Sequence, residues 1–295
     1  MYSEVRPNSC KAWMLAARPK TLTGACVPVL VGAALAWHDG YHAIGPASLC
    51  FAFACLMQIA ANFINDLYDF LRGTDRSDRL GPERACAQGW ITPKAMKMGI
   101  ALVVTAACAV GATVLLWSSP WLIALGAACV LFAFLYTTRL SYMGLGDLLV
   151  FVFFGFVPVM GTYFVVSGTL HWESIVCSLS VGCIIDLLLI VNNYRDRDTD
   201  RISGKRTLIA HFGETFGNRQ YLITGIAGCL FPLLLCITHQ GWSILLPLLY
   251  LPLHFQTWNK MVRIREGRAL NKVLGLTSRN MLIFGILLSV GILLS

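Results

Sequence analysis

Nine apolar segments, each close to the length that a bilayer demands, constrain this chain more than any other feature. A helix needs roughly 20 apolar residues to cross the hydrocarbon core. The segments cover residues 20–37, 47–70, 95–117, 121–138, 146–167, 173–193, 219–238, 242–258 and 275–294. The mean hydropathy of the chain is +0.67, and the connections between the segments are too short to hold a sizeable soluble domain. The sequence therefore predicts an all-α, polytopic membrane protein in which nine transmembrane helices form one integral membrane domain over residues 1–295.

The Lys and Arg residues are confined to alternate connections between these segments. All 23 lie in the amino-terminal arm or after the second, fourth, sixth and eighth segments. Because Lys and Arg concentrate in cytoplasmic loops, we expect a cytoplasmic amino terminus and a carboxyl terminus across the membrane, in a bacterial inner (cell) membrane. The net charge of +8 is spread over these short loops, so the sequence predicts a lipid bilayer and no nucleic acid as partner.

A polar motif, NNYRDRDTDRISGK, occupies residues 192–205 at the end of the sixth apolar segment. In a helix, Asn192, Asp196 and Asp200 lie four residues apart and form one stripe, with about 6 Å of rise between neighbours. Carboxylate and amide oxygens suit a hard divalent cation such as Mg²⁺. Arg195 and Lys205 lie close by and suit phosphate oxygens. The motif therefore predicts a site for a metal diphosphate.

A second motif of the same design ends the second apolar segment. Asn62, Asp66 and Asp69 are spaced i, i+4 and i+7, which places them on one helical face. Arg72 supplies a base, and Asp75 follows shortly after it. A charged loop between two membrane helices would explain one such motif. Two matching acidic faces favour a function, because acidic residues at membrane boundaries are costly.

The two motifs together predict a central cavity with an acidic face on each side. One Mg²⁺ on each face, bridged by a diphosphate, would stabilise the charge that develops as an allylic diphosphate ionises. An apolar cavity below could hold the hydrocarbon tail. The spacing of the motifs also predicts two related halves, about 12–138 and 139–258, with a ninth helix at about 275–294.

These residues resemble the UbiA superfamily of intramembrane prenyltransferases. Residues 65–75 and 192–213 are similar to its two Asp-rich motifs, and residues 17–21, 78–93 and 142–165 resemble the branch that prenylates 1,4-dihydroxy-2-naphthoate. The resemblance implies a UbiA-type fold of nine helices, Mg²⁺ dependence and a polyprenyl diphosphate donor. It also implies prenylation of 1,4-dihydroxy-2-naphthoate with loss of the carboxylate, which gives demethylmenaquinone.

Carried onto this chain, the resemblance assigns roles to individual residues. The implied metal ligands are Asn62, Asp66, Asp69, Asn192, Asp196 and Asp200, with Asp75 close to the first three. The implied diphosphate contacts are Arg195 and Lys205. Tyr136 and Thr137 match the family's Tyr-Thr pair, with Tyr136 as a catalytic residue, and Arg139 is assigned to phosphate or to the acceptor carboxylate. Arg18 is explained equally well as a phosphate contact or as an interfacial anchor.

Other functions fit part of the pattern. Within the same enzyme class, the acceptor could instead be 4-hydroxybenzoate, homogentisate, a haem or a chlorophyllide. A cation-coupled transporter would need ionisable residues near the bilayer centre, whereas only Asp186 lies deep within an apolar segment. A lipid head-group transferase with one acidic site would not need the second motif.

Overall fold

The structure is a computed structural model that describes residues 5–73, 79–239 and 241–295, and within these ranges it contains helices and no strands. The longer helices are α2 (Thr23–His38), α3 (Ile44–Leu71), α4 (Pro93–Val114), α5 (Leu122–Thr138), α7 (Val157–Ser167), α8 (Trp172–Ile202), α10 (Glu214–Leu230), α11 (Leu251–Ile264) and α12 (Leu270–Leu293). The shorter ones are α1 (Cys10–Ala17), η1 (Pro19–Thr21), η2 (Leu140–Met143), α6 (Gly146–Val150), η3 (Phe151–Phe156), α9 (Leu208–Phe212), η4 (Phe231–Ile237) and η5 (Trp242–Tyr250).

Helical structure is present in every predicted apolar segment, which confirms the all-α membrane class. Among the described residues, six continuous helical stretches are long and apolar enough to cross a membrane. A seventh is added if Cys10–Thr21 and Thr23–His38 form one span with a 49° bend. Helix α5 is apolar but shorter than these stretches. The protein is therefore an integral, multi-pass membrane protein, and the exact number of nine spans stays a prediction.

Helix α8 forms the centre of the bundle and carries much of its core. Its buried side chains include Ile184, Leu187 and Ile190, each 0% exposed. It packs against η3, α10 and α12. The approach of η3 requires glycine, because a Cβ atom on Gly155 would lie 2.8 Å from the Cα atom of Gly182. Because α8 is buried on most sides, its packing fixes the position of the second acidic motif at its carboxyl end.

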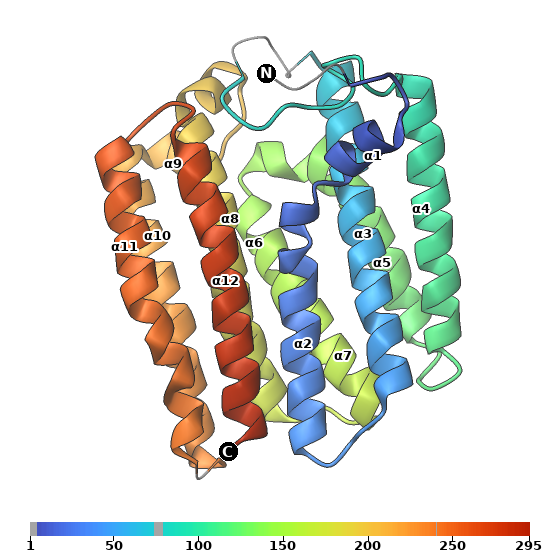
Figure 1. Cartoon of the computed structure of the whole chain (residues 1–295), viewed down its shortest axis with the longest axis vertical. Coiled ribbons are helices and arrows are strands. Elements are labelled where there is room, and N and C mark those ends of the chain that lie inside the picture. Colours follow the sequence, from blue (N-terminus) through green and yellow to red (C-terminus); the bar gives the residue numbers. More distant parts are fainter. Residues whose placement is uncertain (1–4, 74–78, 240) are drawn as a thin grey trace.

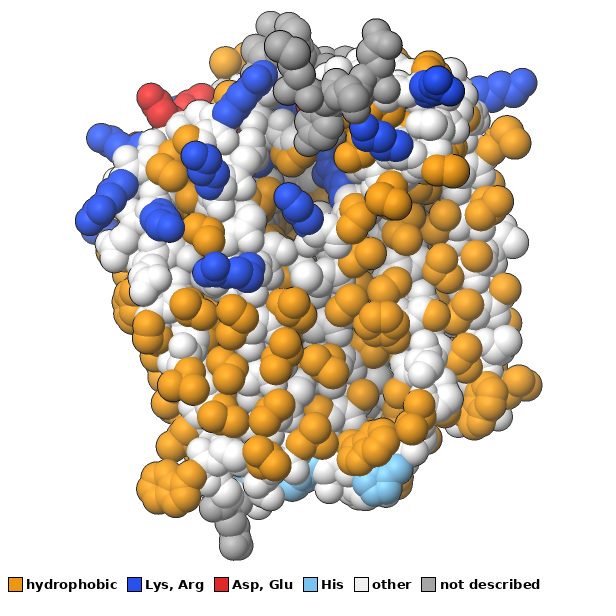
Figure 2. Space-filling view, in the orientation of Figure 1, with side chains coloured by type: hydrophobic (Ala, Val, Ile, Leu, Met, Phe, Trp, Pro, Cys, Tyr) orange, Lys and Arg blue, Asp and Glu red, His pale blue; other side chains and the backbone are white. Residues whose placement is uncertain are grey.

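Both motif-bearing helices end on the same side of the bundle. Figure 1 shows that the carboxyl ends of α3 and α8 both lie at the top of the bundle, whereas α12 ends at the bottom. This arrangement fits an odd number of crossings. Figure 2 shows Lys and Arg side chains gathered at the same top end, while the side chains below them are mainly hydrophobic. The visible face thus agrees with the predicted separation of basic and apolar regions.

Helix α12 packs against both predicted halves of the chain, because it contacts α2 on one side and η5 on the other. Figure 1 shows it at the front, between the two groups of helices. A repeat relationship between residues 12–138 and 139–258 stays a prediction. What the packing establishes is that the last helix lies between the two regions that carry the acidic motifs.

Candidate active site at the end of the bundle

The carboxylate of Asp66 is buried at the end of α3 and is bound by the loop that follows. Its two oxygens accept hydrogen bonds from the backbone amides of Ala85 and Cys86, at 2.7 and 2.8 Å. The Asp66 side chain is 1% exposed. Each carboxylate oxygen keeps further acceptor capacity after one hydrogen bond. Asp66 therefore joins the first motif to the loop before α4 and still has lone pairs to offer.

The other members of the first motif have different neighbours. Asp69 pairs with Arg84 at 2.6 Å. The Asn62 amide group donates to the backbone oxygen of Ala17 and to the hydroxyl of Thr21, both at 2.9 Å. Asn62 thus faces α1 and η1, and its predicted role as a metal ligand stays a prediction. Asp75 lies outside the described residues.

The second motif is part of the continuous helix α8, as the sequence predicts. Arg195 is 4% exposed and forms a two-pronged ion pair with Asp196, with Nε and Nη2 at 2.8 and 2.6 Å from the two oxygens. Asn192 donates to the Leu188 backbone oxygen in its own helix. The stripe that starts at Asn192 and Asp196 continues one turn further, to Asp200.

Asp200 offers the clearest oxygen for a cation. Its Oδ1 atom lies 3.7 Å from the Lys205 amine, whereas its Oδ2 atom is buried without a hydrogen-bond partner. A buried carboxylate oxygen without a partner is costly unless something binds it. Carboxylate oxygen is also the ligand type that Mg²⁺ prefers. The chemistry of this atom fits a bound Mg²⁺.

The described residues do not assemble a complete metal site by themselves. No group of three or more His, Cys, Asp or Glu side chains in this part of the chain converges closely enough to hold a metal ion. The ion pairs explain part of this, because Arg84 holds Asp69 and Arg195 holds Asp196. A metal diphosphate would have to exchange partners with these arginines, its phosphates taking the guanidinium groups and its cations the carboxylates.

Two observations indicate that the two motifs lie near each other. Tyr136, at the end of α5, is within electrostatic reach of Asp69 in the first motif and Asp200 in the second. On the other side, the turn after the first motif lies on Arg195, since a Cβ atom on Gly81 would be 2.9 Å from Arg195 Nη2. The predicted convergence of two polar faces at one end is therefore supported by the contact of Gly81 with Arg195 and by the position of Tyr136 within electrostatic reach of both motifs.

Arg18 lies at the edge of this region, between α1 and η1. Its backbone is left-handed, with φ of 52°, and it is within electrostatic reach of Asp66 and Asp69 as well as of two other arginines. Its Nη2 atom is buried without a hydrogen-bond partner. A buried guanidinium nitrogen without a partner, in a basic cluster, suits an anion. This geometry favours the phosphate contact over the interfacial anchor.

The predicted site residues Arg72, at the end of α3, and Thr137, at the end of α5, hold these two helix ends together, whereas Arg139 does not take part. Arg72 donates to the backbone oxygens of Thr137 and Thr138 and stacks 4.8 Å from the centre of the Tyr142 ring. The Thr137 hydroxyl donates to Asn65 Oδ1. These contacts fasten the end of α3 to the end of α5. Arg139 is exposed at the end of α5, and its assignment to phosphate or carboxylate stays a prediction.

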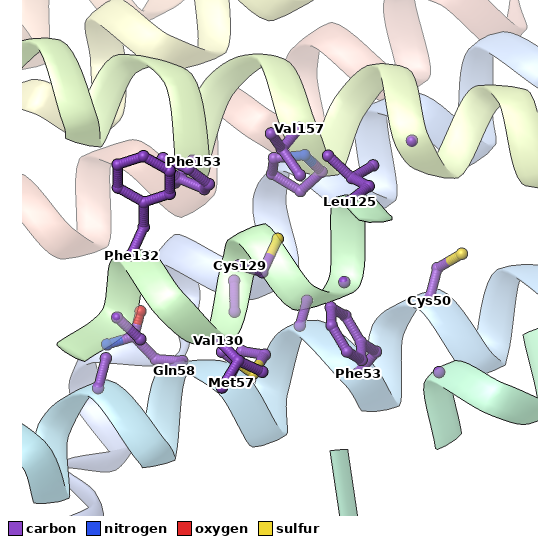
Figure 3. Close-up of a pocket in the computed structure, with 18 of the residues that line it drawn as sticks. Cys50, Phe53, Met57, Gln58, Leu125, Cys129, Val130, Phe132, Phe153 and Val157 are labelled. Carbon is purple, nitrogen blue, oxygen red and sulfur yellow. The ribbon is translucent and has the colours of Figure 1, made fainter. Parts of the chain in front are cut away.

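A large apolar cavity of about 1000 Å³ extends from this region into the bundle. Figure 3 shows its walls, with Phe53 and Met57 from α3, Cys129 and Val130 from α5, and Phe153 from η3. Its polar lining residues include Gln58, Asn65 and Tyr136. Asn65 precedes Asp66 in the first motif. The cavity therefore reaches the first motif at Asn65 and continues between apolar helices, and none of its described lining residues is a carboxylate.

Asn65 and Gln58 line the cavity and were not predicted as site residues. The predicted cavity face of α3 was that of Asn62, Asp66 and Asp69, whereas Gln58, Ala61 and Asn65 form the face that lines it. Asn62 and Asp66 lie on a neighbouring face, covered by η1 and the 84–86 loop. Gln58, Ala61 and Asn65 are also spaced to lie on one helical face. The sequence therefore indicates two adjacent polar faces but does not indicate which of them borders the cavity.

Comparisons with known proteins agree with this geometry. The UbiA prenyltransferase family model matches residues 25–283. The chain is 33% identical to the 1,4-dihydroxy-2-naphthoate octaprenyltransferase of Escherichia coli (strain K12), over 99% of this chain and 98% of that protein.

Solved structures show the same fold. A UbiA homolog from Aeropyrum pernix K1 superimposes with a TM-score of 0.72 at 18% identity, over 93% of this chain and 98% of that one. A UbiA homolog from Archaeoglobus fulgidus, solved with DMAPP and Mg²⁺, gives a TM-score of 0.60 at 14% identity, over 94% and 99% of the two chains. With the family model covering most of its length, this chain belongs to the UbiA prenyltransferase family.

Proposed function

We propose that this protein transfers a polyprenyl group from polyprenyl diphosphate to 1,4-dihydroxy-2-naphthoate, with loss of the ring carboxylate, to form demethylmenaquinone. The observation that carries the proposal is an apolar cavity of about 1000 Å³ that reaches Asn65 in the first motif, while Gly81, in the turn after that motif, lies against Arg195 of the second. A diphosphate head and a hydrocarbon tail need these two environments side by side. The name of the relative from Escherichia coli specifies this acceptor.

The donor head would bind between the ends of α3 and α8. Arg18, Arg84 and Arg195 all lie at this end and supply guanidinium groups, which bind phosphate oxygens through paired hydrogen bonds. Arg195 would exchange the Asp196 carboxylate for a phosphate. Such an exchange keeps each buried charge compensated, which limits the cost of burying the substrate's charge.

Magnesium is the cofactor that these residues suit. The residues that would hold it are Asp66, Asp69, Asp196 and Asp200, joined by Asn62 and Asn192, and the buried Oδ2 atom of Asp200 is the best evidence among them. When bound, Mg²⁺ would neutralise the charge that develops on the departing diphosphate. The Archaeoglobus fulgidus homolog was solved with Mg²⁺ and DMAPP together. Two ions remain our proposal.

The protein's own residues would direct the transfer. The carbon–oxygen bond of the donor breaks at the boundary between the acidic site and the cavity, where Tyr136 and Asn65 lie. Apolar side chains such as Phe53 and Phe153 keep water from the developing allylic cation, so that the aromatic ring is the nucleophile. The ring carbon that bears the carboxylate forms the new bond, and carbon dioxide leaves.

The active site would face the cytoplasm of a bacterial cell. Arg and Lys side chains gather at the end that holds both motifs (Figure 2), and cytoplasmic loops carry an excess of these residues. A cytoplasmic site would receive the soluble acceptor directly and the donor from the inner leaflet. Accessibility of single cysteines to a membrane-impermeant thiol reagent, introduced at Arg268 and at Thr169, would test this orientation.

The proposed function is tested with purified full-length protein, a labelled polyprenyl diphosphate and a panel of aromatic acceptors. We expect a prenylated product and carbon dioxide with 1,4-dihydroxy-2-naphthoate, only when Mg²⁺ is present. EDTA should abolish the reaction and added Mg²⁺ should restore it. Product with 4-hydroxybenzoate or homogentisate alone would replace the proposed acceptor. Turnover that persists without a divalent metal would refute the metal diphosphate site.

A further inference from the structure

The loop between α11 and α12 contacts the second acidic motif and the turn that follows the first, although it is distant from both in sequence. On one side, Arg197 of the second motif donates to the backbone oxygen of Arg265 at 2.8 Å. On the other side, Arg268 donates to the backbone oxygen of Arg79, just after the first motif, at 3.2 Å. Arg265 is also paired with Glu214 at 3.0 Å, and this carboxylate raises the pKa of Arg265. The loop therefore bridges the two halves of the site.

Asn271 makes the most direct of these connections. It lies in the first turn of α12. Its Oδ1 atom accepts a hydrogen bond from Arg195 Nη1 at 2.8 Å, and its Nδ2 atom donates to the backbone oxygen of Leu80, also at 2.8 Å. One amide side chain thus ties an arginine of the second motif to the turn that follows the first.

Arg195 is held on three sides by these contacts. Asp196 accepts from the Nε and Nη2 atoms, Asn271 accepts from Nη1, and Gly81 lies close to the guanidinium, since a Cβ atom on Gly81 would be 2.9 Å from Nη2. The bond to Asn271 uses a nitrogen that the Asp196 pair does not use. It can therefore persist when Arg195 exchanges the carboxylate for a phosphate.

We infer that Asn271 is a positioning residue, which orients Arg195 and the Leu80–Gly81 turn around the diphosphate of the donor. The inference rests on the proposed function and deepens it by adding a residue from the last helix to the donor site. An arginine side chain has many rotamers, so a second anchor lowers the entropy lost when it binds phosphate. Asn271 itself does not touch the reacting atoms.

The test compares Asn271→Ala with Asn280→Ala in purified full-length protein. Asn280 is a matched control, since it lies in the same helix, is 1% exposed and donates hydrogen bonds to Leu253 and Thr257. We expect Asn271→Ala to raise the KM for the prenyl diphosphate about tenfold, with a smaller change in kcat and in the KM for the acceptor. Asn280→Ala should lower the thermal stability without this selective change. Equal KM values for both variants would overturn the inference.

A second measurement does not depend on turnover. Calorimetric binding of inorganic pyrophosphate with Mg²⁺ is measured for the wild type, Asn271→Ala, Arg195→Ala and the double variant. If Asn271 acts through Arg195, its substitution weakens binding about tenfold in the wild type and has little effect once Arg195 is absent. Equal and additive losses would refute the positioning role. A protein that shows this coupling and yet prenylates none of the aromatic acceptors would instead refute the proposed function.

Discussion

Replacing Asp66 by Ala should loosen the loop that covers the first motif, in addition to removing a carboxylate from the site. The Asp66 carboxylate is the acceptor for the backbone amides of Ala85 and Cys86, at 2.7 and 2.8 Å, and all of these atoms are buried. Alanine leaves two buried N–H groups without a partner. Each such group costs about 1–3 kcal/mol, so the loss is about 2–6 kcal/mol. Asn at this position keeps one acceptor oxygen and should lose about half as much.

Because the loss is confined to one loop, it should appear as local opening before global unfolding. Trypsin can cut after Arg84 only when the loop opens, and a cost of about 2 kcal/mol increases the open population about 30-fold. We therefore expect cleavage of Asp66→Ala to be at least about 30 times faster than that of the wild type in detergent. Asp198→Ala is the control, since its side chain is 67% exposed and far from this loop in the sequence. Cleavage of Asp66→Ala at the wild-type rate would refute the role of Asp66 in holding the loop.

Two further predictions concern the metal and the donor chain. Asp200→Asn should raise the Mg²⁺ concentration needed for half-maximal activity at least about tenfold, because it neutralises the buried oxygen that lacks a partner; an unchanged Mg²⁺ titration curve would remove Asp200 from the ligands. Ala54→Trp should shorten the prenyl chain that is accepted, because Ala54 lines the cavity, and mass spectrometry of the products from mixed donors measures this. Leu102→Trp, on a helix surface that is 71% exposed at this residue, is its control, and an identical product distribution for both variants would contradict the assignment of the cavity to the donor tail.

The sequence predicted which residues belong to the candidate site better than it predicted the contacts that they make. Helical spacing correctly placed Asn192, Asp196 and Asp200 in one continuous helix, because their spacing is a local property of the chain. It did not reveal that Arg195 forms an ion pair with the Asp196 carboxylate. It also did not distinguish the face of Asn62 from the adjacent face of Asn65, which is the one that borders the cavity. Such choices depend on which neighbouring element packs against the helix.

The sequence by itself determined the membrane class, the approximate position of the helices and the two acidic ends that lie on one side with the basic residues. These features follow from the length of apolar runs and from charge, which act locally. Only the tertiary structure decided which partner each carboxylate has. Asn271 reaches Leu80, 191 residues away, because α12 packs between the two regions of the bundle. A contact of this kind has no periodicity in the sequence, since it depends on how several helices pack together.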